Sequence, residues 1–337
     1  MIPLPLLLLS PVAGSLPVDR PKVVATLPTV AALVREVAGD AVDVLALGRG
    51  DEDPHFVPAT PLLMRRARDA RALFEVGMRL EIWADHVASG SGNPAIQRGT
   101  PGRVVLSDGL SPLEVPTRID AAAGDIHPQG NPHLWLDPVR AKQMARNAAT
   151  ALERLIPDSA PGFRERLADF EARLDRALYG EELLRLVGAR TLDNRVLSGT
   201  LHEFLDREHG GAPLRERAGG WLARARPLRG AKAIEYHKVW AYFAQAFGLE
   251  LRGVIEEYPG VRPGPGHVQR TIESLRRESI PLVLVDNFYE RDLPGHVAKE
   301  GGARIVVLPN QVEGEEGVRT YFDLVDTILG RLLAALP

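Results

Sequence analysis

Hydrophobic residues in the first part of the chain alternate between short β-branched runs and segments with a helical period. The runs predict strands, and the periodic segments predict helices between them. The predicted strands are residues 22–27, 42–47, 72–76 and 103–106, and the predicted helices are 30–37, 61–68 and 80–88. Because strands separated by helices pair in parallel through right-handed crossovers, this pattern indicates an α/β lobe over residues 20–159.

The same rhythm returns later in the chain and predicts a second α/β lobe over residues 188–337. Its strands are expected at residues 231–235, 249–255, 281–286 and 304–308, and its helices at 239–247, 268–278 and 293–300. The predicted fold class is therefore α/β, with two lobes that each hold an open, mainly parallel sheet flanked by helices. Within the second lobe, residues 190–228 read as an elaborated surface segment without an evident role.

The segment between the lobes, residues 160–187, is predicted to be one long amphipathic helix. Its hydrophobic side chains recur every three to five residues, at Phe163, Leu167, Phe170, Leu174, Leu178 and Leu183. This spacing favours a helix, and the segment lacks the glycine and serine of a flexible linker. We therefore expect a rigid helical connection between the lobes.

The first 19 residues resemble a secretory signal. The apolar run MIPLPLLLL is followed by small residues, although the positively charged leader is missing. The run is too short to cross a bilayer, which takes about 20 apolar residues. We expect an exported protein, periplasmic or otherwise extracytoplasmic, with a frayed apolar tail as the alternative.

Charge and cysteine content narrow the partners and the chemistry. The 337 residues include 41 basic and 44 acidic side chains, a net charge of −3, and these are interspersed. No basic field for nucleic acid is evident, so nucleic acid is not expected as a partner. Because the chain has no cysteine, any metal site must use nitrogen and oxygen donors.

Three of the nine histidines stand just beyond predicted strand ends. They are His55 and His133, each preceded by proline, and His237. Ligands of open α/β sheets bind at this edge, and imidazole suits Zn²⁺, Cu²⁺, Ni²⁺ and Fe²⁺. Three imidazoles and one further donor would complete a tetrahedron around Zn²⁺. Since His55 and His133 belong to the first lobe and His237 to the second, the site is expected in the inter-lobe cleft.

Several strings extend the pattern over nearly the whole chain after residue 20. They are DPH at 53–55, NPHLWLDP at 131–138, YHKVWAYF at 236–243, EYPG at 257–260 and VLP at 307–309, with Tyr321 ahead of a last helix. In these the chain resembles the metal-specific solute-binding proteins of ABC importers, the zinc and manganese class. The resemblance implies two lobes joined by a rigid helix, with His55, His133 and His237 as metal ligands.

The resemblance also implies a function. With a histidine at position 237, the chain resembles the zinc-binding branch of the family, because manganese binders tend to carry a carboxylate there. The implied protein is no enzyme but a monomeric, high-affinity receptor that binds Zn²⁺, ahead of Mn²⁺, as transported ligand. It would deliver the ion to the membrane subunit of an ABC importer.

The fourth ligand is open. Many family members supply an aspartate after the last strand, where this chain has Asn310. Asp286, at the end of the preceding predicted strand, is the substitute candidate, because Zn²⁺ accepts aspartate oxygen. Water and Asn310 are the alternatives. His127 is either a loose collecting donor or a structural turn residue.

Other residues receive supporting or neutral assignments. Asp137 or Glu235 could accept the free ring N–H of a ligand histidine. Solvent exposure is expected for the remaining histidines, namely His86, His202, His209, His267 and His296.

Two further function classes stay open. A zinc hydrolase would hold an activated water at the fourth position, but the chain lacks a His-Glu-x-x-His signature. A manganese-binding or adhesin-like member of the same family is the other.

Because imidazole must lose its proton to bind a metal, the affinity for the metal should fall below about pH 6.

Overall fold

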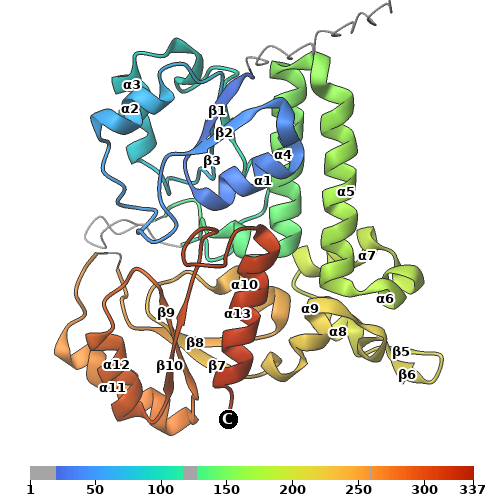
Figure 1. The fold of residues 1–337 in the computed structure, drawn as a ribbon. Coiled ribbons are helices and arrows are strands. Elements are labelled where there is room, and N and C mark those ends of the chain that lie inside the picture. Colours follow the sequence, from blue (N-terminus) through green and yellow to red (C-terminus); the bar gives the residue numbers. More distant parts are fainter. Residues whose placement is uncertain (1–19, 117–126, 259) are drawn as a thin grey trace, which may run out of the picture.

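The computed structural model describes residues 20–116, 127–258 and 260–337, so the signal-like segment 1–19 lies outside the described part. Two lobes are stacked on one another, and two long helices run along one side of the first lobe (Figure 1). In the described ranges no helix combines the length and apolar character that a membrane crossing requires.

The first lobe is a four-stranded parallel sheet in the order β2-β1-β3-β4. Its strands are β1 (Lys22–Ala25), β2 (Asp43–Ala46), β3 (Leu73–Glu75) and β4 (Arg103–Val105). Its helices are α1 (Pro28–Ala38), α2 (Pro61–Ala67) and α3 (Trp83–Ser91). The inner strand β1 is β-branched and fully buried at Val23 and Val24, as expected of a central parallel strand.

The second lobe repeats this topology. Its parallel sheet has the order β10-β9-β7-β8, from β7 (Lys232–Glu235), β8 (Glu250–Val254), β9 (Leu282–Asp286) and β10 (Arg304–Leu308). Its helices are α10 (Ala241–Phe247), α11 (Pro265–Glu278), α12 (Asp292–Gly301) and α13 (Tyr321–Ala335). In both sheets the first strand lies between the second and the third. Each lobe therefore has a topological switch point between its first and third strands, where α/β sheets bind ligands.

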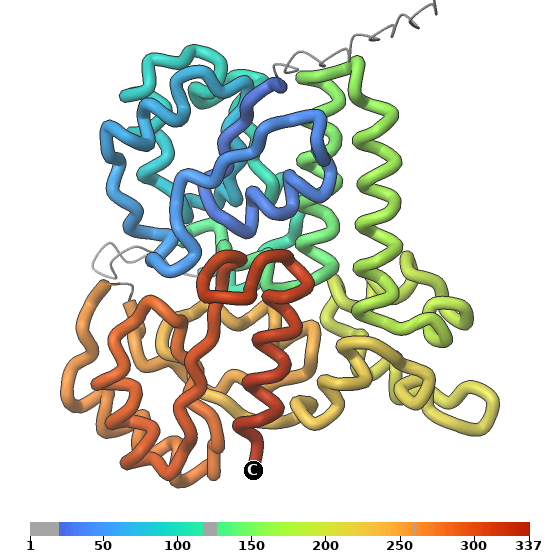
Figure 2. Tube along the Cα trace, in the orientation of Figure 1, coloured from blue at the N-terminus to red at the C-terminus, as the bar shows by residue number. Residues whose placement is uncertain are grey.

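The connection between the lobes consists of two antiparallel helices, α4 (Pro138–Leu155) and α5 (Ala160–Tyr179), which lie side by side (Figure 2). The prediction of one helix over 160–187 is wrong at its end. Gly180, with a φ of 75°, ends α5, and α6 (Glu181–Val187) begins after it. At 1.5 Å per residue, α5 is about 30 Å long.

Residues 181–218 form an excursion that leaves and returns at one point. This side module contains α6, α7 (Ala189–Leu197), α8 (Leu201–Leu205) and the hairpin β5 (Glu208–His209) and β6 (Ala212–Pro213). At its base Gly219 N–H donates to Tyr179 O over 2.8 Å. A Cβ on Gly180 would lie 2.4 Å from Gly219 Cα, so glycine is required there. The chain resumes the second lobe with α9 (Gly220–Arg224).

The two lobes are hydrogen bonded to each other directly. Trp135 Nε1 donates to Asn310 O over 2.6 Å, and Tyr321 Oη donates to Trp135 O over 2.7 Å. Val312 N donates to Thr29 Oγ1 over 2.9 Å. Side chains at the boundary are therefore fixed from both sides.

Candidate metal centre

Four histidine rings meet where the two lobes face each other. The ring centroids of His55 and His133 are 5.4 Å apart, those of His55 and His237 also 5.4 Å, and those of His133 and His237 6.1 Å. The fourth ring, His127, lies 5.0 Å from His55 and 6.4 Å from His133. The structure thus brings together the three histidines that the sequence singles out, and adds His127.

These spacings suit a shared ion. Two imidazoles that bind one tetrahedral ion through Nε2 at about 2.0–2.1 Å have ring centroids roughly 5 Å apart. Within the described part of the chain, no group of three or more His, Cys, Asp or Glu side chains already has a metal-binding arrangement. His55 Nε2 instead lies 3.0 Å from His127 Nε2, at hydrogen-bond distance. The rings are close enough for one ion, but two of them, His55 and His127, are hydrogen bonded to each other.

The two first-lobe histidines are held by the same local device. In Asp53-Pro54-His55, one carboxylate oxygen, Asp53 Oδ1, accepts from both His55 N (2.9 Å) and His55 Nδ1 (2.7 Å). In the second string, Asn131 Oδ1 accepts from His133 N and His133 Nδ1, each over 2.9 Å. The side chain two residues before each histidine therefore fixes its backbone and its ring together.

His237 has a distant partner for the same purpose. It follows β7, and its Nδ1 donates to Glu256 Oε2, 2.9 Å away just beyond β8. Each of the three rings thus has its Nδ1 proton engaged by an oxygen, which leaves the lone pair on Nε2. Such oxygen acceptors orient metal-binding histidines in proteins.

Burial keeps the deeper imidazoles neutral. Burial, with His55 and His237 nearby, lowers the pKa of His133 well below its usual range, and it lowers the pKa of His127 to about 3. For Asp53, burial opposes ionisation, but the hydrogen bonds from His55 outweigh it and lower the pKa of the carboxyl. Neutral imidazoles beside an ionised carboxylate are the protonation states that a metal cation requires.

Asp286 lies at the switch point of the second sheet. In the register of β7 and β9, Glu235 pairs with Leu284. His237 lies two residues beyond the end of β7, and Asp286 is the last residue of β9. Asp286 Oδ1 accepts from Asn310 Nδ2 over 3.0 Å. Asp286 Oδ2 and His133 Nε2 are buried, and neither has a hydrogen-bond partner among the described residues. Burial raises the pKa of Asp286 well above its usual range. A cation would relieve this desolvation, so the chemistry of the carboxyl suits a metal ligand.

The predicted ring acceptors Asp137 and Glu235 are wrong. Asp137 caps α4 through Val139 N and pairs with Arg140, and Glu235 accepts from the backbone N–H groups of Val239 and Trp240. Sequence reasoning missed Asp53, Asn131 and Glu256. Two of these had a local signal, because the same Asx-Pro-His string occurs twice.

The expectation for the other histidines holds in part. His86, His209 and His296 are exposed. His202 is half-buried against Gly248, and half-buried His267 lies 3.0 Å from Val254 O through its Nε2. Half-buried histidines were not expected at these two positions.

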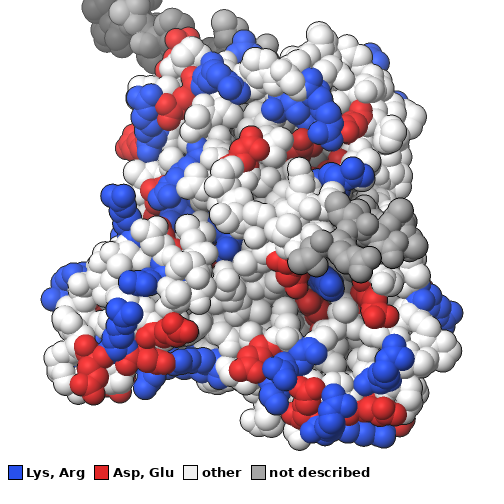
Figure 3. All heavy atoms as spheres, turned by 180° about the vertical axis from the view of Figure 1, so that it is seen from behind, with Lys and Arg blue, Asp and Glu red and all other residues white. Residues whose placement is uncertain are grey.

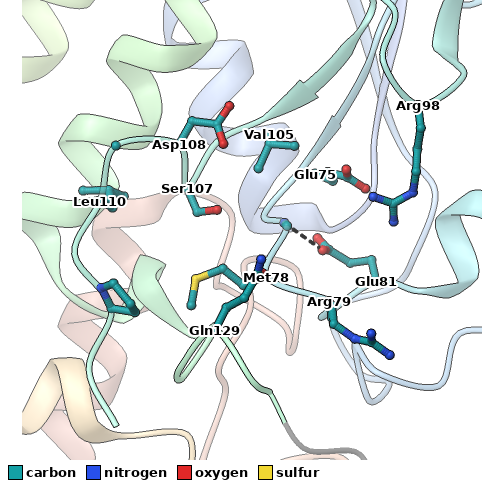
Figure 4. Close-up of a pocket in the computed structure, with 13 residues that line it drawn as sticks. Glu75, Met78, Arg79, Glu81, Arg98, Val105, Ser107, Asp108, Leu110 and Gln129 are labelled. Atoms are coloured by element: carbon teal, nitrogen blue, oxygen red, sulfur yellow. Dashed lines mark hydrogen bonds between the residues drawn. The ribbon is translucent and has the colours of Figure 1, made fainter. Parts of the chain in front are cut away.

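A separate hollow lies at the carboxyl ends of β3 and β4. It has a volume of about 440 Å³, and its lining includes Met78, Ser107 and Glu81 (Figure 4). Glu81 curls back to accept from Gly77 N, which shapes the turn after β3. None of the four clustered histidines lines it.

On the molecular face in Figure 3, basic and acidic side chains intermingle, as the charge balance predicts.

The chain has two lobes, each built on a parallel sheet, which are joined by helices and carry a polar cluster at their boundary. These features define the class of two-lobed solute-binding proteins. Within this class, the model of the family described as zinc-uptake complex component A, periplasmic (ZnuA) matches residues 23–178 and 221–335. The chain therefore belongs to the ZnuA family. The match leaves out the whole of the side module, residues 181–218.

Relatives with different metals are similarly distant. The iron-binding protein YfeA of Yersinia pestis is 24% identical over 311 residues, which cover 90% of this chain and 83% of YfeA. The manganese ABC transporter substrate-binding lipoprotein PsaA of Streptococcus pneumoniae is 20% identical, covering 94% and 89% of the two chains. A crystal structure of ZnuA has a TM-score of 0.68 at 20% identity and covers 94% of this chain and 99% of its own.

Family membership settles the general function. The chain is a metal-binding component of ABC metal uptake, from a family that is periplasmic or extracytoplasmic and acts with permease and ATPase components. ZnuA-family proteins are substrate-binding proteins and not enzymes, so the hydrolase alternative is excluded and the prediction of no enzymatic activity is confirmed. The prediction of two α/β lobes with parallel sheets is confirmed as well.

Proposed function

We propose that this chain is a monomeric zinc receptor that binds one Zn²⁺ through His55, His133, His237 and Asp286 and delivers it to the membrane subunit of an ABC importer. The observation that carries the proposal is the set of three Nε2 lone pairs, each fixed by an oxygen on Nδ1, on rings 5.4 to 6.1 Å apart. An ion bound by all three would join the two lobes.

The donor types favour zinc among the metals of the family's relatives. Three imidazoles suit Zn²⁺ and Fe²⁺, whereas Mn²⁺ prefers carboxylate and water oxygen. Zn²⁺ also forms stable four-coordinate sites with nitrogen and oxygen donors. The zinc-uptake description of the matching family agrees with this choice.

The fourth donor has two protein candidates. Asp286 adds a negative charge to three neutral ligands, which favours a dication. His127 belongs to the histidine cluster, with its Nε2 3.0 Å from His55 Nε2. We assign Asp286 as the ligand and His127 as a donor that holds His55 until the ion displaces it.

A calorimetric titration of purified protein with Zn²⁺ tests the site. We expect one ion per chain, with Zn²⁺ binding more tightly than Mn²⁺ or Fe²⁺ in competition. His55→Ala, His133→Ala and His237→Ala should each weaken binding at least a hundredfold, because each removes one of the four proposed donors and leaves a three-coordinate site. His86→Ala, an exposed histidine on α3, is the matched control and should bind like the parent.

Unchanged zinc affinity in His237→Ala would refute a site shared by the lobes. Preference for Mn²⁺ or Fe²⁺ over Zn²⁺ would refute the zinc assignment and leave a receptor for the other metal. For the fourth donor, Asp286→Asn should weaken binding and His127→Gln should not. The reverse result would exchange their roles.

A further inference from the structure

Tyr289 of the second lobe lies beside His237 and is hydrogen bonded to Asp53, the first-lobe residue that holds His55. It lies in the loop after β9, where its hydroxyl donates to Asp53 Oδ2 of the first lobe over 3.2 Å. Its ring centroid lies 6.2 Å from that of His237, and its ring packs at a tilt against Tyr236 and Phe288, with centroids 4.7 Å apart in both pairs. The phenol is thus held rigidly by its own lobe while its hydroxyl reaches the other.

The hydroxyl bonds to the carboxylate that orients His55. Asp53 Oδ1 is already used twice, by the backbone and the ring of His55. Tyr289 supplies the donor for the remaining oxygen, Oδ2. Tyr289 thus completes the hydrogen bonding of a carboxylate that is only 18% exposed.

Asn131, whose side chain holds His133, is also hydrogen bonded to the second lobe. Asn131 Oδ1 holds His133, and Asn131 Nδ2 donates to Lys238 O over 3.0 Å. Asp53 and Asn131 thus each join a first-lobe histidine to a second-lobe atom. The arrangement occurs at both first-lobe histidines, although the second-lobe donor or acceptor differs.

We propose that Tyr289 is a positioning residue that couples the placement of the second lobe to the orientation of His55 and so controls how fast the bound metal is released. This inference rests on the proposed function. While the lobes are together, Tyr289 fixes Asp53, and Asp53 fixes the His55 ring with Nε2 free to bind. When the second lobe moves away, Asp53 Oδ2 loses its donor, the carboxylate turns, and His55 loses its fixed orientation.

Removal of the hydroxyl alone tests this coupling. Tyr289→Phe keeps the ring and its stacking but removes the bond to Asp53. Partners of metal-binding histidines change metal affinity about 10- to 100-fold when mutated, and Tyr289 acts one bond further out. We therefore expect release of Zn²⁺ to a chelator, measured by stopped flow, to become about tenfold faster.

The matched control is Tyr236→Phe, which removes a hydroxyl from the same aromatic stack and should change release less than twofold. The decisive variant is Asp53→Ala. In that background Tyr289→Phe should have less than a twofold further effect, because its route to His55 is gone. Equal acceleration in both backgrounds, or none in the parent, would overturn the proposal.

A spectroscopic measurement keeps the test sound even if Asp53→Ala does not fold. In zinc-loaded protein with ¹⁵N-labelled histidine, Tyr289→Phe should shift the Nδ1–H resonance of His55 and leave that of His133 in place. Equal shifts, or no shift, would mean that Tyr289 acts by packing. If the parent binds none of Zn²⁺, Mn²⁺ and Fe²⁺, the proposed function fails, which is distinct from these outcomes.

Discussion

A histidine binds a metal through one ring nitrogen, so the atom that engages the other nitrogen decides whether the ring is ready. In this chain a carboxylate holds His55, an amide oxygen holds His133 and a second carboxylate holds His237. A carboxylate acceptor raises the basicity of the ring, which strengthens its bond to a cation. The three ligands are therefore expected to contribute unequally.

Glu256→Gln tests the carboxylate that holds His237. The substitution keeps an oxygen near Nδ1 but removes the charge, so zinc affinity should fall roughly tenfold. The measurement is competition with a chromogenic chelator at pH 7. Glu235→Gln is the control: burial raises the pKa of Glu235 to about 8, so it is mostly protonated at pH 7 and the change should alter affinity less than threefold. Equal losses in both variants would contradict a specific role for Glu256.

At the residue scale the sequence predicted which histidines gather but not what holds them. His55, His133 and His237 follow strand ends, and parallel strands deliver such residues to one edge. Asp53 and Asn131 could have been read from their identical spacing to histidine. Glu256 could not, because it is 19 residues from His237 and reaches it only through the pairing of β7 with β8.

At the scale of elements, strand prediction succeeded where β-branched runs are short and bounded. The long helix α4 was missed because its buried face is mostly small, with Ala141, Ala145 and Ala148 in place of larger apolar residues. The connector helix α5 was extended too far because Leu183 continues the apolar spacing past Gly180. Gly180, with its positive φ of 75°, ended the helix against that pattern.

The turn after β3 makes folding stability depend on pH. Burial, with Glu75 nearby, raises the pKa of Glu81 from 4.5 to about 7, even though Thr26 Oγ1 and Val76 N donate to it. Between these values the unfolded chain releases the proton and the folded chain keeps it. The free energy of unfolding should therefore fall as pH rises from 4.5 to 7, by up to about 3 kcal/mol, and this contribution should then level off.

Urea unfolding of the metal-free protein at several pH values measures this effect. Glu81→Gln should flatten the profile over that range, because glutamine does not titrate. Glu165→Gln, at an exposed position of α5, serves as control and should keep the parent's slope. A parental slope in Glu81→Gln would assign the pH dependence to other groups.

At the scale of the whole molecule, the side module is attached to the connector by a buried charge. Lys142 of α4 pairs with Asp175 of α5 and with Asp193 of the module, 2.6 Å away. Tyr179 Oη also donates to Asp193 over 2.8 Å. Buried Leu192 and Val196 of α7 join the main hydrophobic core. The module thus supports the connector without contributing any of the clustered histidines.

Joining Gly180 directly to Gly219 should remove the module without moving the metal site. The two glycines already touch, so the new bond closes a short gap. We expect one Zn²⁺ per chain with affinity within about fivefold of the parent. The free energy of unfolding should fall by about 3 kcal/mol, because Lys142 loses one partner and apolar surface is exposed. Thermal unfolding and calorimetry measure both, and loss of zinc binding by a folded deletion variant would place the module in the site.

The Asx-Pro-His string has a use outside this protein. One side-chain oxygen and one proline define the backbone, the ring and the tautomer of the histidine within three consecutive residues. Designed metal sites often fail because supporting residues on distant elements are imprecise. A ligand whose support is encoded locally could be grafted at a strand end as a single cassette, with Asp or Asn chosen to set how strongly the ring donates.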